Sequence, residues 1–139
     1  MTSWREARAN LVWPRRVMVV EDEEFLRELV VRAILREGYE VEGAATAAEA
    51  LQLASHQAFD VVITDWVLTD DNGPGLIRAL RKAGLRARMV VVSGYAGSLD
   101  MDLLTELGVD AVLAKPAEIR EILEVIGDLV SIPGREEEE

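Results

Sequence analysis

The feature that most constrains the fold is a regular alternation of short apolar runs with longer segments of helical periodicity. Runs of β-branched and other apolar residues predict buried strands, whereas apolar residues spaced three and four apart predict amphipathic helices. Five strands, each followed by a helix, predict an α/β fold with a parallel sheet. The predicted strands are residues 17–20, 39–44, 59–65, 87–92 and 111–114.

The helical segments carry signals for their ends and for their buried faces. Thr46 and Glu49 have the spacing of a capping box, and Gly108 follows a helix expected from about residue 98 to 107. The first helix is expected to bury the apolar residues at its helical spacing, namely Phe25, Leu26, Leu29, Val30, Ala33 and Ile34.

These elements predict a flavodoxin-like, doubly wound, five-stranded parallel sheet with strand order 2-1-3-4-5 and helices on both faces. In such sheets the functional groups gather at the carboxyl ends of the strands. The second strand lies at an edge in this order and ends in the chemically inert Gly43 and Ala44. The other four strands are therefore expected to surround one crevice.

Composition narrows the classes of protein to consider. The 139 residues are 50% hydrophobic, which suits one compact domain with its own core. No apolar run reaches the length of a membrane span, and the chain has no cysteine, so a cytoplasmic location is the default expectation. The net charge of -11 argues against direct binding to DNA.

Polar residues follow the four strands that surround the expected crevice. They are Glu21 and Asp22 after the first strand, Asp65 at the end of the third, Ser93 after the fourth and Lys115 after the fifth. An isolated Asp65 would be equally well explained as the start of a turn. The agreement between these positions and the topology favours a functional site.

Three carboxylates in one crevice repel one another, and each close pair costs about 4 kcal/mol at an effective dielectric constant of about 20. Lys115 can neutralise one charge, and a divalent cation can hold the others. Oxygen ligands without histidine or cysteine favour Mg²⁺, with Mn²⁺ as an alternative. A salt-bridged structural cluster would explain Lys115 but would leave Ser93 unexplained. With a metal present, Asp65 could act as a nucleophile that forms an aspartyl phosphate.

The chain resembles the response-regulator receiver domains of two-component phosphorelay signalling, in their stand-alone form. The resemblance implies that Asp65 takes a phosphoryl group from a histidine kinase or a histidine phosphotransfer protein. The domain would catalyse its own phosphorylation and slow dephosphorylation, and would change conformation to control a downstream protein. The residues that carry the resemblance, in chain order, are Glu21, Asp22, Asp65, Ser93, Lys115 and Pro116.

The same resemblance implies roles for the residues around Asp65. Ser93 would hydrogen-bond the phosphoryl group, and Lys115 would pair with it ahead of a cis Pro116. The implied Mg²⁺ ligands are Asp22, Asp65, the backbone carbonyl of Val67 and, through water, Glu21.

Two departures from the family pattern concern the loop after Asp65 and the expected readout. Thr69 stands where the family often has proline, and Val112 stands where it has a switch aromatic residue. Val112 argues against the usual aromatic readout, so output is expected to use another surface. An alternative reading is an interaction module that acts independently of phosphorylation, and the complete set of site residues argues against it. A nucleotide-binding domain is disfavoured because the acidic loop at residues 21–24 would repel phosphates. An Asp-based phosphatase is disfavoured because Val67 occupies the place of its second carboxylate.

The two ends of the chain lie outside the receiver domain, which is expected to span residues 17–130. Residues 1–16 have Trp4, Ala7 and Leu11 at helical spacing and predict a short helix, with an arm for a partner or a homodimer as the alternative. Residues 131–139 end in four glutamates and predict a disordered acidic tail.

Overall fold

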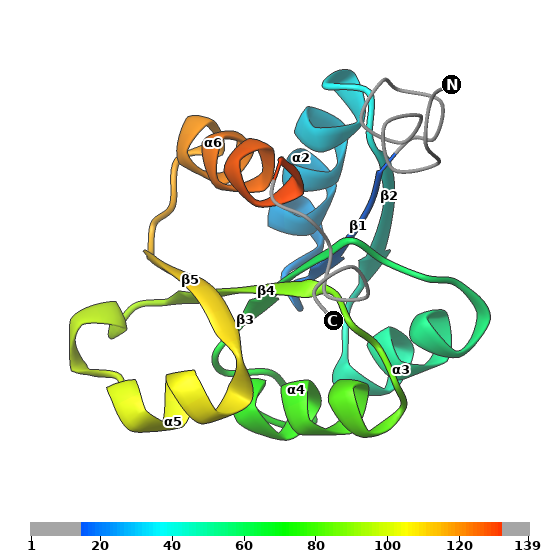
Figure 1. The fold of residues 1–139 in the computed structure, drawn as a ribbon. Helices are drawn as coiled ribbons and strands as arrows, with labels where there is room; N and C mark the ends of the chain where they lie inside the picture. The colour runs from blue at the N-terminus through cyan, green and yellow to red at the C-terminus, as the bar shows by residue number, and fades with distance from the viewer. Residues whose placement is uncertain (1–14, 132–139) are drawn as a thin grey trace, which may run out of the picture.

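A parallel five-stranded sheet forms the centre of the computed structural model, which describes residues 15–131. The strand order is β2-β1-β3-β4-β5, as the sequence predicts, and every strand pair is parallel (Figure 1). The strands are β1 (Arg16–Val20), β2 (Glu40–Ala44), β3 (Val61–Asp65), β4 (Arg88–Ser93) and β5 (Val109–Ala114). The helices are α2 (Glu24–Arg36), α3 (Ala47–His56), α4 (Gly73–Lys82), the 3₁₀ turn η1 (Ala96–Ser98), α5 (Met101–Leu107) and α6 (Ile119–Val130).

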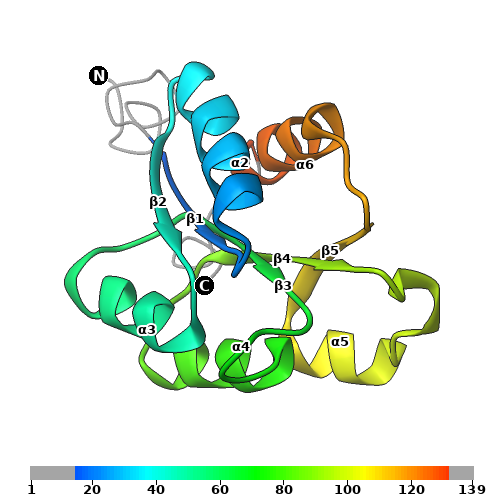
Figure 2. The same ribbon diagram turned by 180° about the vertical axis from the view of Figure 1, so that it is seen from behind.

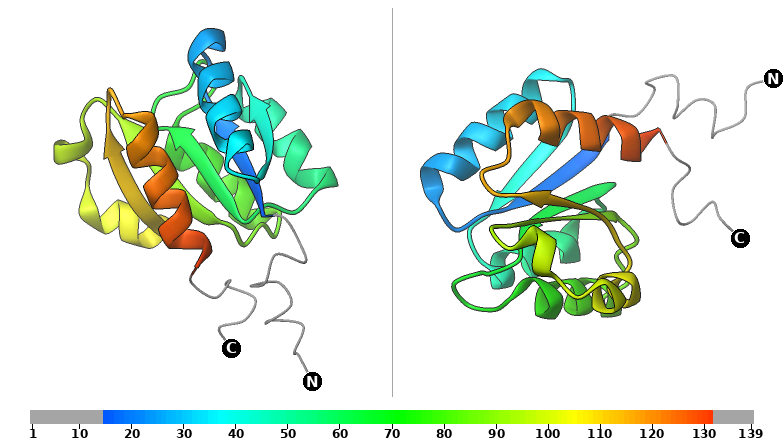
Figure 3. Two further views of the ribbon diagram at one scale, coloured as in Figure 1. Left: turned by 90° about the horizontal axis from the view of Figure 1, so that it is seen from above. Right: turned by 90° about the vertical axis from the view of Figure 1, so that its left-hand side faces the viewer.

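Helices cover both faces of the sheet and divide the core into two layers. Helices α2 and α6 lie side by side on one face, and α3, α4 and α5 cover the other (Figures 1 and 2). Alternation along β1 supplies both layers: Val17 and Val19 pack with α2 and α6, whereas Met18 and Val20 face the opposite layer. Every residue of β3 is buried, as expected for a central strand between two helical layers (Figure 3).

Capping residues account for several helix boundaries. The Thr46 hydroxyl accepts the backbone N–H of Glu49, but the Glu49 carboxylate accepts the N–H of Ala45, so the predicted reciprocal capping box is only half formed. Gly108 ends α5 in the left-handed conformation (φ 72°), which glycine adopts without steric cost. The full capping box is at α6, between Glu118 and Glu121.

Two expectations about the helices were wrong in detail. The helix expected from residue 98 is interrupted, because Leu99 is extended and the Asp100 carboxylate caps a new helix that begins at Met101. Phe25 and Leu29 were expected in the core, yet their side chains are 72% and 45% exposed. Only part of the apolar stripe of α2 is therefore buried.

The described residues, 15–131, include the whole of the expected domain at residues 17–130. β1 begins at Arg16, one residue earlier than predicted. The predicted helix containing Trp4 and the acidic tail lie outside the described residues. Between residues 15 and 131, none of the helices has both the length and the apolar character that crossing a membrane requires.

Candidate functional site

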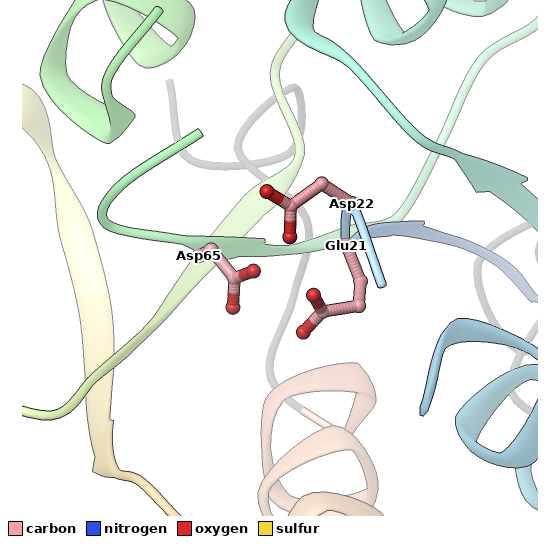
Figure 4. Close-up of side chains that lie close together, drawn as sticks. All are labelled: Glu21, Asp22 and Asp65. Carbon is pink, nitrogen blue, oxygen red and sulfur yellow. The ribbon is translucent and has the colours of Figure 1, made fainter. Parts of the chain in front are cut away.

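Three carboxylates meet where β1 and β3 end. β1 and β3 are paired so that Val20 lies opposite Thr64, and this register places Glu21 and Asp22 beside Asp65. One oxygen from each of the three carboxylates lies within 4.8 Å of the others. Figure 4 shows Asp22 and Glu21 on one side of the crevice and Asp65 on the other. The sequence-based prediction of an acidic cluster is therefore matched by the geometry.

Glu21 is the most strongly perturbed carboxyl group. Its side chain is buried, and the backbone N–H of Glu23 donates to its Oε2 at 3.0 Å. Burial raises the pKa of Glu21 to about 7; the Glu23 N–H opposes this rise and the neighbouring Asp65 adds to it. Near neutral pH the cluster without a metal is therefore poised to hold a proton.

The two carboxylate oxygens of Asp65 differ in their partners. Its Oδ1 lies 3.0 Å from the Lys115 Nζ, whereas its Oδ2 is buried without a hydrogen-bond partner among the described residues. Burial raises the pKa of Asp65, although the hydrogen bond from Lys115 acts in the opposite direction. A buried carboxylate oxygen without a partner is costly, so it points to a ligand that completes the site.

Asp22 differs from the other two carboxylates because it is exposed. The Thr69 hydroxyl donates to its Oδ2 at 2.8 Å. This hydrogen bond is the largest influence on the pKa of Asp22 and lowers it. Thr69 was noted in the sequence only as a departure from the family pattern, and its contact with Asp22 could not be foreseen from the spacing.

Lys115 and Ser93 reach the same edge from β5 and β4. The Lys115 Nζ lies 3.8 Å from Glu21 Oε1, and its backbone N–H donates to the Ser93 carbonyl at 2.9 Å. Burial alone would lower the pKa of Lys115, but the hydrogen bond to Asp65 and the charges of the three neighbouring carboxylates together raise it. The peptide bond before Pro116 is cis, as the resemblance implies.

The Ser93 side chain is engaged with its own loop. Its hydroxyl accepts the backbone N–H of Tyr95 at 3.0 Å. The residue is buried, at the end of a strand whose neighbour contributes Lys115. Ser93 is thus at the expected edge of the sheet, and its hydroxyl is bonded to the backbone of the following loop.

The donor set of this cluster suits a hard divalent cation. All of the side-chain donors are carboxylate oxygens, and the buried Asp65 Oδ2 lacks a partner that a cation would provide. The backbone carbonyl of Val67 remains a predicted ligand. Val67 itself is exposed and forms a short antiparallel bridge with Asn72 in the loop before α4.

An apolar cavity of about 340 Å³ extends from the site between α2 and α6. Glu21, Asp65 and Lys115 lie along its lining, and Leu26 and Ile122 contribute apolar walls. This cavity could not be predicted from the sequence, because it depends on the distance between α2 and the loop before α6.

The fold and the site residues are those of a known protein family. The family model of the response regulator receiver domain matches residues 17–127. The chain belongs to the response regulator receiver domain family. The predicted receiver fold is therefore confirmed.

The chain is similar to several receiver-containing proteins. A probable transcriptional regulatory protein of Picosynechococcus is 35% identical over 122 residues, covering 83% of this chain and 49% of the relative. The CheY-like receiver domain protein of Methanospirillum hungatei has a TM-score of 0.79 at 30% identity, covering 86% of this chain and 96% of that structure. TrrA of Thermotoga maritima, in complex with Mg²⁺-BeF, has a TM-score of 0.71 at 27% identity, covering 83% and 98%. The chain spans about half the length of the curated transcriptional regulators it matches.

Proposed function

We propose that this chain is a phosphoryl-accepting receiver in which Asp65 takes a phosphoryl group from a phosphohistidine donor. The observation that carries the proposal is the state of the Asp65 carboxylate. One oxygen is paired with Lys115, and the other is buried without a partner at the centre of an acidic cluster. An ion pair with a purely structural role would explain the contact with Lys115 but not the buried oxygen that has no partner.

In the proposed reaction an Asp65 carboxylate oxygen attacks phosphorus. The new O–P bond forms as the N–P bond to the donor imidazole breaks, and the bonding electrons leave with that nitrogen. Lys115 reduces the repulsion between the carboxylate and the incoming phosphoryl oxygens. Asp65 is buried, so little water surrounds it, and the attraction between Lys115 and the anionic groups is stronger than it would be in water.

Mg²⁺ is the cation that best suits the proposed site. Glu21, Asp22, Asp65 and the Val67 carbonyl would hold it, with Glu21 acting through water. The metal would supply positive charge against the phosphoryl oxygens. The oxygen-only donor set and the Mg²⁺-BeF complex of the Thermotoga relative support this choice, and Mn²⁺ is the alternative.

The proposed output is a conformational change that controls a protein partner. The Ser93 hydroxyl accepts the Tyr95 N–H and keeps its own O–H to donate, and a shift of the loop after β4 would direct that O–H at a phosphoryl group on Asp65. Such a movement would bias a two-state equilibrium in the segment from Gly94 to α5. The proposed donor is a histidine kinase or a histidine phosphotransfer protein.

Intact mass spectrometry with acetyl phosphate and Mg²⁺ tests the acceptor. The wild-type chain should gain one phosphoryl group, and Asp65→Asn should gain none. Asp60→Asn is the matched control, because Asp60 lies at the opposite end of β3 and contacts Arg15 and the Arg16 backbone. Uptake by Asp65→Asn equal to that of Asp60→Asn would reject the assignment.

A further inference from the structure

We propose that Thr69 is a positioning residue that sets the divalent-cation affinity of the site by holding the Asp22 carboxylate in place. This inference rests on the proposed metal site at Glu21, Asp22 and Asp65. It assigns a role to a residue outside the set of ligands and the phosphoryl acceptor.

The contact that carries the inference joins two loops. The Thr69 Oγ1 donates to Asp22 Oδ2 at 2.8 Å, which connects the loop before α4 to the segment after β1. Glu21 and Asp65 are 6% and 4% exposed, so packing fixes their side chains. Asp22 is exposed, so its orientation depends more heavily on this hydrogen bond.

Thr69 is itself held on a fixed section of backbone. The carboxylate of the next residue, Asp70, accepts the N–H groups of Ala47 and Ala48 at the start of α3, at 2.9 and 3.1 Å. Asn72 caps α4 by accepting the N–H of Gly75 at 2.8 Å. The loop is therefore anchored to the first turns of two helices, with the Thr69 hydroxyl directed at Asp22 from between them.

A hydrogen bond that orients a carboxylate ligand reduces the order that a metal must impose on binding. Loss of such an outer contact commonly lowers metal affinity by about 10- to 100-fold. The Thr69 hydroxyl is the group that donates here, so valine, which has the same shape, keeps the packing and removes the hydrogen bond. Serine keeps the hydroxyl and removes only the methyl group.

An NMR titration with Mg²⁺ tests this role in the full chain without a phosphoryl donor. Thr69→Val should weaken Mg²⁺ binding about tenfold or more, and Thr69→Ser should stay within about threefold of wild type. Thr105→Val is the matched control, because the Thr105 hydroxyl donates to the Met101 carbonyl within α5, away from the site. This control should bind Mg²⁺ as the wild type does.

Two results would overturn the role of Thr69 alone: Thr69→Val binding Mg²⁺ as tightly as wild type, or Thr69→Ser binding as weakly as Thr69→Val. Thr69→Ala provides a second hydroxyl-free variant if the valine chain does not fold, and it should show the same loss. Wild-type protein that binds no Mg²⁺ would reject the metal site itself, and with it this inference. If Thr69→Val does not change the affinity for Mg²⁺ and Asp65 is still phosphorylated to the normal extent, the role of Thr69 is wrong but the proposed function stands.

Discussion

The amino and carboxyl ends of the parallel strands differ in how their charged side chains are paired. At the amino end, cations and anions are matched across neighbouring strands. Arg16 contacts Glu40 at 2.6 Å and donates its backbone N–H to Asp60 at 2.9 Å. Arg88 and Asp110 form a further pair at 3.5 Å. These contacts join β1 to β2 and β4 to β5.

At the carboxyl end, three carboxylates share the crevice with one lysine. Asp65 and Glu21 both approach Lys115, at 3.0 and 3.8 Å, while Asp22 turns to the Thr69 hydroxyl. The cluster is consequently more negative than its partners can balance. The carboxyl end therefore carries an excess of negative charge, and the proposed metal site would use this excess.

Removal of divalent cations should have the largest effect on this contrast. With the metal chelated, phosphoryl uptake should fall by about 100-fold or more, because repulsion of several kcal/mol between anions is then unopposed. The rate of mass gain from acetyl phosphate, measured with EDTA and after Mg²⁺ is restored, checks this. Asp60→Asn is the control at the amino end. EDTA and Mg²⁺ should change its thermal unfolding temperature by the same amount as they change that of the wild type. Undiminished uptake in EDTA would mean that the carboxyl end is balanced without a metal.

The pH dependence of stability should show the next largest effect. The pKa of Glu21 is raised from 4.5 to about 7, so the folded state favours the protonated acid more than the unfolded state does. In metal-free protein the contribution of Glu21 to the free energy of unfolding should therefore be largest below pH 4.5 and be lost as the pH rises through about 7. The expected decrease is on the order of 2 kcal/mol. The raised pKa of Asp65 acts in the same direction.

Urea unfolding between pH 5 and 8 measures this decrease. Glu21→Gln, which mimics the protonated acid, should flatten the profile, whereas Glu40→Gln at the amino end should keep it. Mg²⁺ should also flatten the profile, since it favours the ionised carboxylates. A Glu21→Gln profile as steep as that of wild type would show that the excess charge lies elsewhere.

The lifetime of the phosphorylated state should show a smaller effect, at the rim of the site. Val67 and Tyr95 are 69% and 74% exposed there, and we expect them to shield the path of the attacking water. Val67→Asn combined with Tyr95→Ala should accelerate loss of phosphate about tenfold, because an amide can orient a water and alanine opens the approach. Phosphate release after removal of the donor measures the rate. Met101→Ala, which removes another exposed apolar side chain, should leave the lifetime unchanged.

The same contrast explains how much could be predicted from the sequence. Strand order and the polar residues at strand ends were predictable, because apolar periodicity fixes where each strand stops and the topology brings those ends together. Asp65 and Lys115 come from strands far apart in sequence, yet each directly ends or follows a strand. Contacts that depend on loop conformation were not predictable.

Thr69 and Asp70 illustrate that limit. Both lie in the loop before α4, where no periodicity relates a residue to its distant partner. The Thr69 contact with Asp22 and the Asp70 contacts with α3 require the folded backbone of that loop. The exposure of Phe25 was missed for a related reason, since a helical pattern gives the apolar face but not how much of that face its neighbours cover.

Mapping the phosphoryl group to one carboxylate tests the central claim most directly. Borohydride reduction of the phosphorylated chain converts an aspartyl phosphate to homoserine. Digestion with trypsin then releases residues 37–78 as one peptide, because no lysine or arginine lies between Arg36 and Arg78. That peptide contains Asp60 from the amino end and Asp65 from the carboxyl end, together with Asp70 and Asp71 from the loop. Fragmentation should place homoserine at position 65 alone. Homoserine at 60, 70 or 71, or in the peptide that contains Asp22, would contradict the assignment of Asp65 as the acceptor.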